Sequence, residues 1–237
     1  MRAPQPLLDR LADGPGMGRG GRRLVVLMGQ LGDFDSLEYA QALAAVLPGL
    51  QAAGITLLAI AIGNAAGADR FCAFTGLPRT CLQVDDAPLL HRQLDLYGGL
   101  CTSGGPWTDL LLMCAGIGSP GTLAEVLRGY SGDRQAPARL NVALFDLLGR
   151  GYQRPFELAT VRLRNMVEVL GHWRTYVPTD AHLTQRGGTF LLDGNDNLLY
   201  SHRDAGILGF SATMNRPLSF LDPYLHDDGA GESGVRD

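Results

Sequence analysis

The sequence predicts an α/β domain built on a central mixed sheet flanked by helices. Two runs, residues 24–28 and 55–62, are almost entirely apolar and have the length of strands buried on both faces. Apolar residues at helical spacing over 37–47 lie between them, which is the order of a strand–helix–strand unit with parallel strands. Near the end of the chain, residues 189–192 and 197–201 flank an Asp-Gly-Asn-Asp turn, as in an antiparallel hairpin.

The first half of the chain continues this alternation. Residues 1–21 are rich in Gly, Pro and Arg and lack apolar periodicity, which predicts a flexible tail. The helix after the first strand is expected to stop at Pro48 and Gly49. Beyond the second strand we expect a short helix, a short strand and another helix, over residues 68–75, 81–84 and 88–97.

A long insertion, about 104–186, separates this part from the hairpin. Ser119 as N-cap, with Pro120 after it, predicts a helix, and residues 159–173 predict a second one. We interpret the insertion as a helical layer of the same domain, followed by the hairpin and a closing helix over 211–221. The expected division is a tail, one domain and a second tail, over residues 1–21, 22–225 and 226–237. The order βαβαβ, then ββα, is that of an elaborated thioredoxin fold.

The amino-acid composition excludes several classes of function. The chain has 237 residues, of which 46% are apolar and 19% charged, as in an ordinary globular protein with a buried core. All 20 basic residues are Arg, so phosphate-binding P-loops, Schiff-base enzymes and protein kinases, which need a Lys, are excluded. A net charge of −4 gives no electrostatic case for nucleic acid or an anionic membrane. The longest apolar run, 110–117, is too short to span a bilayer.

The cysteines and histidines show no metal or dithiol pattern. The four thiols are not arranged as Cys-x-x-Cys, and the five His residues have no metal-ligand spacing, so we expect no metal and no cofactor. No secretory segment precedes the cysteines, which predicts reduced thiols and a cytoplasmic protein. Cys72 and Cys114 lie in apolar surroundings and are expected to be buried and inert. Cys101, in a Gly-rich loop, is the thiol expected to be exposed.

Three stretches carry a family resemblance. They are Arg23-Leu-Val-Val-Leu-Met-Gly-Gln-Leu-Gly-Asp-Phe-Asp-Ser-Leu-Glu-Tyr-Ala40, the stretch 50–63, and Gln185-Arg-Gly-Gly-Thr-Phe-Leu-Leu-Asp-Gly-Asn-Asp-Asn-Leu-Leu-Tyr-Ser-His-Arg-Asp204. Together they resemble the peroxiredoxin-like 2 group of AhpC/TSA-type antioxidant proteins, and cyanobacterial and plastid members in particular. The resemblance covers about 22–103 and 184–222 and implies a thioredoxin-like fold.

The resemblance also locates a site. The family loop after the first strand reads Gly-Cys-x-x-Cys, whereas this chain reads Gly32-Asp-Phe-Asp-Ser36, so Asp33 and Ser36 fall at the two cysteine positions. Reduction of a peroxide needs a thiolate, and a Ser hydroxyl does not replace it. These polar residues are interpreted first as caps of the following helix and, as the alternative, as a rebuilt ligand site. Arg186 lies, offset by one residue, near the position of the family's thiolate-steadying Arg, and is expected to lie near this loop.

Two function hypotheses follow from the resemblance. The preferred one is a non-catalytic, peroxiredoxin-like pseudoenzyme that binds a protein partner of unknown identity through the insertion and the altered loop. A homodimer is compatible with it. The alternative is a thiol-dependent antioxidant oxidoreductase, a peroxidase that uses a relocated cysteine such as Cys101.

Overall fold

The computed structural model describes residues 1–12, 17–18, 20–119, 150–207, 209–213 and 216–225. Its centre is a five-stranded sheet with the order β3-β2-β1-β4-β5. The strands are β1 Arg22–Gln30, β2 Ile55–Ile62, β3 Leu82–Asp85, β4 Gly188–Leu192 and β5 Leu198–Arg203. Strands β1, β2 and β3 pair in parallel, and β4 and β5 extend the sheet antiparallel beyond β1. The predicted mixed sheet, the parallel pair β1 and β2, and the hairpin are confirmed, and the arrangement is thioredoxin-like.

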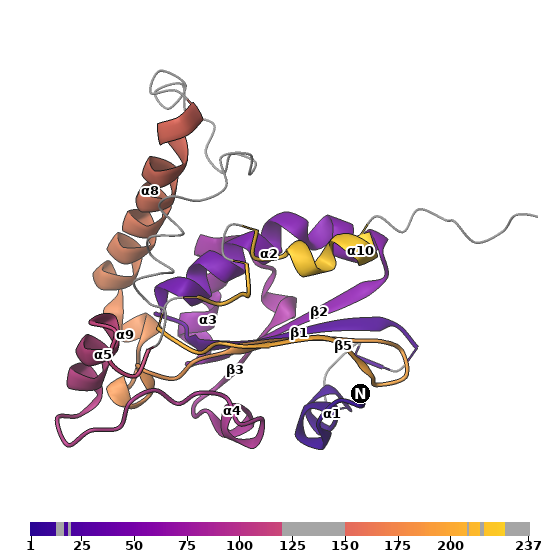
Figure 1. Ribbon diagram of the computed structural model, residues 1–237, viewed down its shortest axis with the longest axis horizontal. Coiled ribbons are helices and arrows are strands. Elements are labelled where there is room, and N and C mark those ends of the chain that lie inside the picture. Colours follow the sequence, from indigo (N-terminus) through magenta and orange to yellow (C-terminus); the bar gives the residue numbers. More distant parts are fainter. Residues whose placement is uncertain (13–16, 19, 120–149, 208, 214–215, 226–237) are drawn as a thin grey trace, which may run out of the picture.

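Helices cover both faces of this sheet (Figure 1). The helices are α1 Gln5–Ala12, α2 Phe34–Ala52, α3 Ala65–Thr75, α4 Leu89–Gln93, α5 Pro106–Cys114, α8 Arg150–Gly171, α9 Trp173–Tyr176 and α10 Asp222–Leu225. Short 3-10 turns lie at Arg79–Cys81, Asp180–His182 and Ser219–Leu221. Helices α2, α3 and α10 lie on one face, α1 and α4 lie on the other, and α8 stands at one end of the molecule beside α5 and α9.

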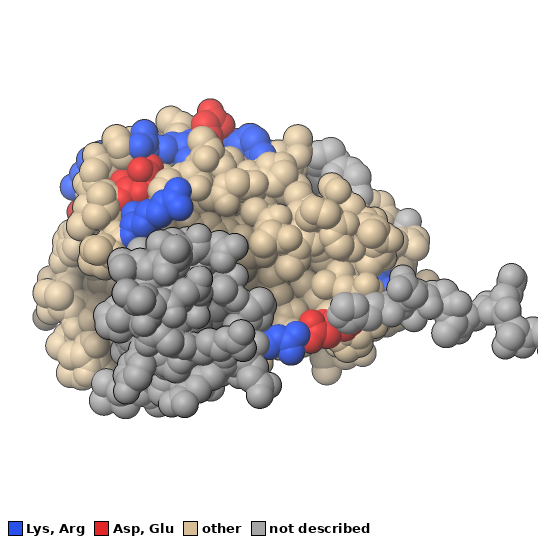
Figure 2. All heavy atoms as spheres, turned by 90° about the horizontal axis from the view of Figure 1, so that it is seen from above, with Lys and Arg blue, Asp and Glu red and all other residues tan. Residues whose placement is uncertain are grey.

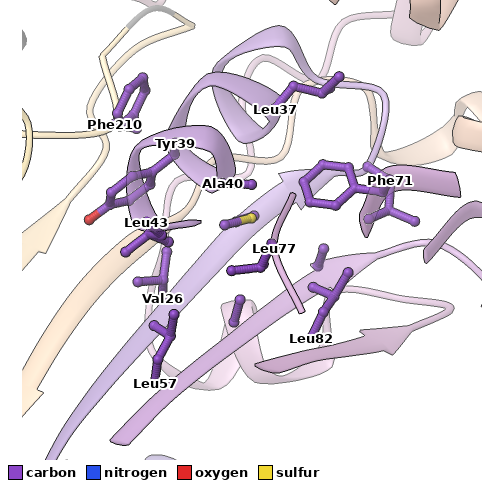
Figure 3. Close-up of a cluster of buried hydrophobic side chains, with 14 of the residues drawn as sticks. Val26, Leu37, Tyr39, Ala40, Leu43, Leu57, Phe71, Leu77, Leu82 and Phe210 are labelled. Carbon is purple, nitrogen blue, oxygen red and sulfur yellow. The ribbon is translucent and has the colours of Figure 1, made fainter. Parts of the chain in front are cut away.

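The apolar strands are explained by a core on each side of the sheet. Successive side chains of a strand point to opposite faces. Val26 therefore joins the cluster under α2 and α3, whereas Val25 joins the cluster under α1 and α4. Figure 3 shows Val26 and Leu57 beneath Leu43 of α2 in the first of these clusters. Because both faces are buried, β1 has no alternation of apolar and polar residues.

The expected flexible tail over residues 1–21 is wrong for its helical part. Residues 5–12 form α1, and Leu7, Leu8 and Leu11 are buried. These side chains pack with Val25 and Leu27 of β1. Because Gly and Pro residues flank it, this short amphipathic helix was not recognised in the sequence. Its apolar side chains cover a face of the sheet that would otherwise be exposed to water. The second expected tail, 226–237, lies outside the described residues.

Two helix ends also differ from expectation. Helix α2 continues past Pro48 to Ala52, and Leu50 in this last turn is fully buried. Burial of Leu50 and the bond from the Ala53 N–H to the Gly49 carbonyl, 2.9 Å, stabilise the extra turn. Helix α4 ends early, and Asp95 beyond it has a left-handed φ of 55°.

The described residues of the expected closing helix, 211–213 and 216–221, do not form a continuous helix. The Ser211 hydroxyl donates to the Pro217 carbonyl at 2.7 Å, a loop bond that competes with a helical path. Helical structure returns only in the turn Ser219–Leu221 and in α10.

The described part of the insertion packs on α2 and α3. The expected helix over 159–173 is present as part of the longer α8, while the helix expected after Ser119 falls outside the described residues. The Gln41 side-chain amide of α2 donates to Asn165 of α8 at 2.9 Å. No helix in the described ranges is both long and apolar enough to cross a membrane.

Candidate functional site

The polar cluster begins where β1 leads into α2. Asp33 is the N-cap of α2, with extended φ and ψ of −73° and 127°. Its Oδ1 accepts from the Asp35 N–H at 3.4 Å, and its Oδ2 accepts from the Ser36 hydroxyl at 3.3 Å. A short acceptor side chain at this position satisfies amide groups that the first helical turn leaves unpaired. The predicted capping role is confirmed for Asp33, whereas Ser36 donates to the cap instead of capping by itself.

Arg186 lies directly over this cap. It comes from the segment before β4, and its Nη1 is 3.3 Å from Asp33 Oδ2. The same nitrogen donates to the Ile207 carbonyl at 3.1 Å, and Nε donates to the Thr184 carbonyl at 3.3 Å. Only 3% of Arg186 is exposed, so it is a buried, carboxylate-paired residue and not a surface one. The expected proximity of Arg186 to the loop is confirmed.

A glycine makes this approach possible. A Cβ at Gly29, near the end of β1, would lie 2.8 Å from the Gln185 carbonyl oxygen and 3.2 Å from Asp33 Oδ2. Any side chain there would displace the segment that carries Arg186. Gly29 therefore lets the start of α2 and the segment before β4 meet.

A second ion-pair group lies one turn further along α2. Arg162 of α8 places Nη2 3.6 Å from Asp35 Oδ1 and Nε 3.4 Å from Glu38 Oε2. The Gly209 N–H donates to Asp35 Oδ2 at 2.8 Å. Burial, followed by repulsion from Asp33, raises the pKa of Asp35 to about 7, although Arg162 lowers it. Asp35 therefore titrates near neutral pH inside the protein.

Asp204, just after β5, completes the cluster. The Gly187 N–H donates to its Oδ2 at 3.1 Å, and His202 Nε2 lies 3.4 Å from its Oδ1. Burial raises the pKa of Asp204 to about 7, against a lowering by Arg186, and burial lowers the pKa of His202. Both directions favour neutral side chains, so we treat the contact between them as polar and not as a full ion pair.

Two residues of this cluster, Arg162 and Asp204, were not singled out from the sequence as site residues. In the sequence, Arg162 is one of several Arg residues on an amphipathic helix, and Asp204 is a polar residue at the end of a hairpin. The local signal was the cluster of acidic residues after Gly32. Such a cluster predicts that basic side chains lie nearby, but it does not identify which residues they are.

None of the four cysteines lies in the loop between β1 and α2 or within α2. Cys101 is exposed, as predicted, and Cys72 is buried, as predicted. Cys114 is exposed, which corrects the expectation that it is buried, because the neighbouring Met113 takes the inward position at the end of α5. Burial raises the pKa of Cys72 to about 11 and raises those of Cys81 and Cys114. These three thiols are therefore poorly ionised at neutral pH.

The arrangement favours structural electrostatics over chemistry on a solute. Ser36 is only 4% exposed and already donates to Asp33, so its hydroxyl cannot meet a substrate in this conformation. Among the described residues, no group of His, Cys, Asp and Glu could hold a metal ion. Figure 2 shows basic and acidic side chains close together on the face drawn there, without a broad area of one sign among its described residues.

The family follows from the sheet, the hairpin and a comparison with known families. A family model described as AhpC/TSA antioxidant enzyme matches residues 42–206. The match includes most of the sheet and Arg186, and it starts within α2, after Asp33 and Ser36. This protein belongs to the AhpC/TSA antioxidant family. Searches of curated proteins and of solved structures found no match.

Proposed function

We propose that this protein is a non-catalytic, partner-binding member of the AhpC/TSA family in which Asp33 and Ser36 replace the redox cysteines. The observation that carries the proposal is the ion pair between the buried Arg186 and the half-buried Asp33. A guanidinium at this place could steady a thiolate, but here an internal carboxylate already neutralises it. No cysteine lies in the loop or in the first turns of α2.

The chemistry of peroxide reduction supports this proposal. A thiolate attacks the peroxide and becomes a sulfenic acid, and a thiol at a helix N-terminus is favoured because its pKa is lowered. A Ser hydroxyl does not accept oxygen in this way. The acidic neighbours Asp35 and Glu38 would also oppose an anion beside Ser36.

Peroxide consumption in the presence of a thiol reductant tests the proposal. The wild type is expected to consume hydrogen peroxide no faster than the same concentration of free cysteine. The double variant Asp33→Cys/Ser36→Cys should acquire a pair that loses two titratable thiols on oxidation, whereas Ser36→Cys alone should not. Fast consumption by the wild type would overturn the proposal.

A second candidate function is thiol-dependent peroxide reduction by a relocated cysteine. The exposure of Cys101 and Cys114 favours it. Burial raises the pKa of Cys114, but Arg186 lowers it, so this thiol feels the same guanidinium as Asp33. Loss of a fast wild-type reaction in Cys101→Ser or Cys114→Ser would establish this function and identify the thiol.

The cysteines support a proposal about the cellular compartment of the protein. All four are free, and free thiols persist in reducing compartments, which supports our proposal that the protein is cytoplasmic. Affinity capture from native extract, followed by competition with purified protein, would identify the proposed partner. Retention of no protein that the competitor displaces would count against partner binding.

A further inference from the structure

Asp35 is a buried carboxyl group with incomplete hydrogen bonding. It lies in the first turn of α2, and its side chain is closed to water. Oδ2 accepts from the Gly209 N–H at 2.8 Å, whereas Oδ1 has no hydrogen-bond partner among the residues that the structure describes. A carboxylate that leaves water is stabilised by donors at both of its oxygens, so this setting favours the protonated form.

The charged groups that act on Asp35 come from three parts of the fold. Burial raises the pKa of Asp35, and so do the carboxyl groups of Asp33 and Glu38 at the start of α2. The guanidiniums of Arg162 on α8 and Arg186 before β4 lower it. Arg186 is already paired with Asp33 at 3.3 Å, so Arg162 is the cation on which an ionised Asp35 would depend most. Three further titratable side chains lie around Arg186, namely Asp204, its neighbour His202, and Cys114.

Arg162 reaches Asp35 from the insertion without completing the contact. Figure 1 shows α8 beside the start of α2, and Arg162 Nη2 lies 3.6 Å from the unbonded Asp35 Oδ1. This distance is within the range of an ion pair but exceeds that of a charge-assisted hydrogen bond, about 2.7–2.9 Å. The Arg162 side chain is 29% exposed and has several rotatable bonds, so its guanidinium can move closer without a shift of α8.

We infer that Asp35 and Arg162 form a proton-controlled clasp between α2 and the insertion helix α8. While Asp35 holds a proton, Arg162 faces a neutral carboxyl group there and pairs with Glu38 at 3.4 Å. When Asp35 releases the proton, Oδ1 becomes negative and Arg162 closes the gap to a charge-assisted hydrogen bond. The clasp therefore tightens as pH rises through neutrality. It does not depend on peroxide chemistry or on a partner.

The clasp offsets only part of the cost of burying an ionised Asp35. Rising pH still destabilises the whole fold, because Asp35 loses its proton more readily in the unfolded chain. The contribution of Arg162 has the opposite sign, since its attraction to Asp35 appears only when that carboxyl group is ionised. The pair is partly exposed, so its attraction should lie between that of surface pairs and that of buried pairs. This corresponds to about tenfold in the equilibrium constant of unfolding.

A double-mutant cycle measured by urea unfolding tests the clasp. Asp35→Asn, Arg162→Gln and the combined variant are compared with the wild type at pH 5.5 and at pH 8. The coupling between the two residues should be about tenfold in the unfolding equilibrium constant at pH 8 and under about twofold at pH 5.5.

The matched control is the pair of Arg70 and Glu168, which joins α3 to α8 at 2.7 Å. Burial raises the pKa of Glu168, but hydrogen bonds from Arg70 and Tyr176 bring it below its ordinary value, so Glu168 is ionised at both pH values. The coupling in a cycle of Arg70→Gln and Glu168→Gln should therefore be the same at pH 5.5 and at pH 8.

Carbon-13 NMR of the Asp35 carboxyl group measures its protonation directly and, for the wild type, needs no variant. The wild-type midpoint is expected near pH 7. Because the coupling is reciprocal, Arg162→Gln should raise this midpoint by about one pH unit, and Arg162→Lys, which keeps the charge, should remain close to the wild type. Three results would overturn the inference. They are a wild-type Asp35 that titrates below pH 5, a midpoint that Arg162→Gln leaves unchanged, and a coupling at pH 8 that is no larger than at pH 5.5.

Discussion

Replacement of Asp35 by Asn tests whether burial of an ionisable carboxyl group at the start of α2 destabilises the fold at neutral and higher pH. Asp35 is 4% exposed, and its pKa is raised to about 7 by burial and by Asp33. In the unfolded chain the ordinary value is 3.8. Between about pH 4 and 7 the folded state therefore holds a proton that the unfolded state has lost, and stability falls as pH rises through this window.

The magnitude follows from the two pKa values. A shift from 3.8 to about 7 corresponds to about 4 kcal/mol between the protonated and ionised forms, and roughly 2–3 kcal/mol of this is lost between pH 5 and 8. Asp35→Asn removes the ionisation while keeping an oxygen that can accept from the Gly209 N–H. The variant should therefore be more stable than the wild type at pH 8, by about 2 kcal/mol, and its stability should depend less on pH.

Urea unfolding at pH 5, 6, 7 and 8 measures this difference directly. Part of the pH dependence should remain, because Asp204 also has a pKa raised to about 7. Asp109→Asn is the matched control: Asp109 is equally buried, at 4% exposed, but accepts from both the N–H and the hydroxyl of Thr102. Its replacement should lower stability at every pH. If Asp35→Asn is less stable than the wild type at pH 8 and keeps the wild-type slope, Asp35 is a well-compensated partner of Arg162 and the reasoning is refuted.

Three further changes should affect the free energy of unfolding, measured in urea. Arg186→Leu leaves the half-buried carboxylate of the α2 cap without its partner and should cost about 2–4 kcal/mol. Arg216→Leu removes an exposed salt bridge and should cost under about 1 kcal/mol, and equal losses would contradict a special role for Arg186. Leu7→Ala should cost about 2–4 kcal/mol because α1 is part of the core, and Leu89→Ala, at an exposed site, under about 0.5 kcal/mol; a neutral Leu7→Ala would mean that α1 does not pack in solution. Gly187→Ala should cost more than about 3 kcal/mol, because its Cβ would overlap a backbone carbonyl of β1 that cannot move aside; wild-type stability would show that β1 and β4 separate easily.

The sequence alone was sufficient for the elements that form by local rules. An apolar run with no alternation predicts a strand buried on both faces, and β1 and β2 form such strands. The turn Asp-Gly-Asn-Asp predicts the hairpin of β4 and β5. The acidic cluster after Gly32 predicts a capped helix start, and Asp33 caps α2. In each case neighbouring residues determine backbone conformation, so the information lies within a few positions.

Only the tertiary structure decided which polar residues meet and which faces are covered. Arg162 reaches the start of α2 from a distant part of the chain, so no spacing rule could pair it with Asp35. The proximity of Arg186 to Asp33 was expected from the family resemblance alone, and the tertiary structure supplied the contact itself. Residues 5–12 form a buried helix because a sheet face needs cover, which their own composition does not show. The amphipathic pattern of α8 was visible in the sequence, but its orientation was not. Periodicity shows that a helix has two sides, whereas the surrounding contacts determine which side faces inward. In α8 the inward side combines the bonds of Gln41 and Arg70 with burial of Val169.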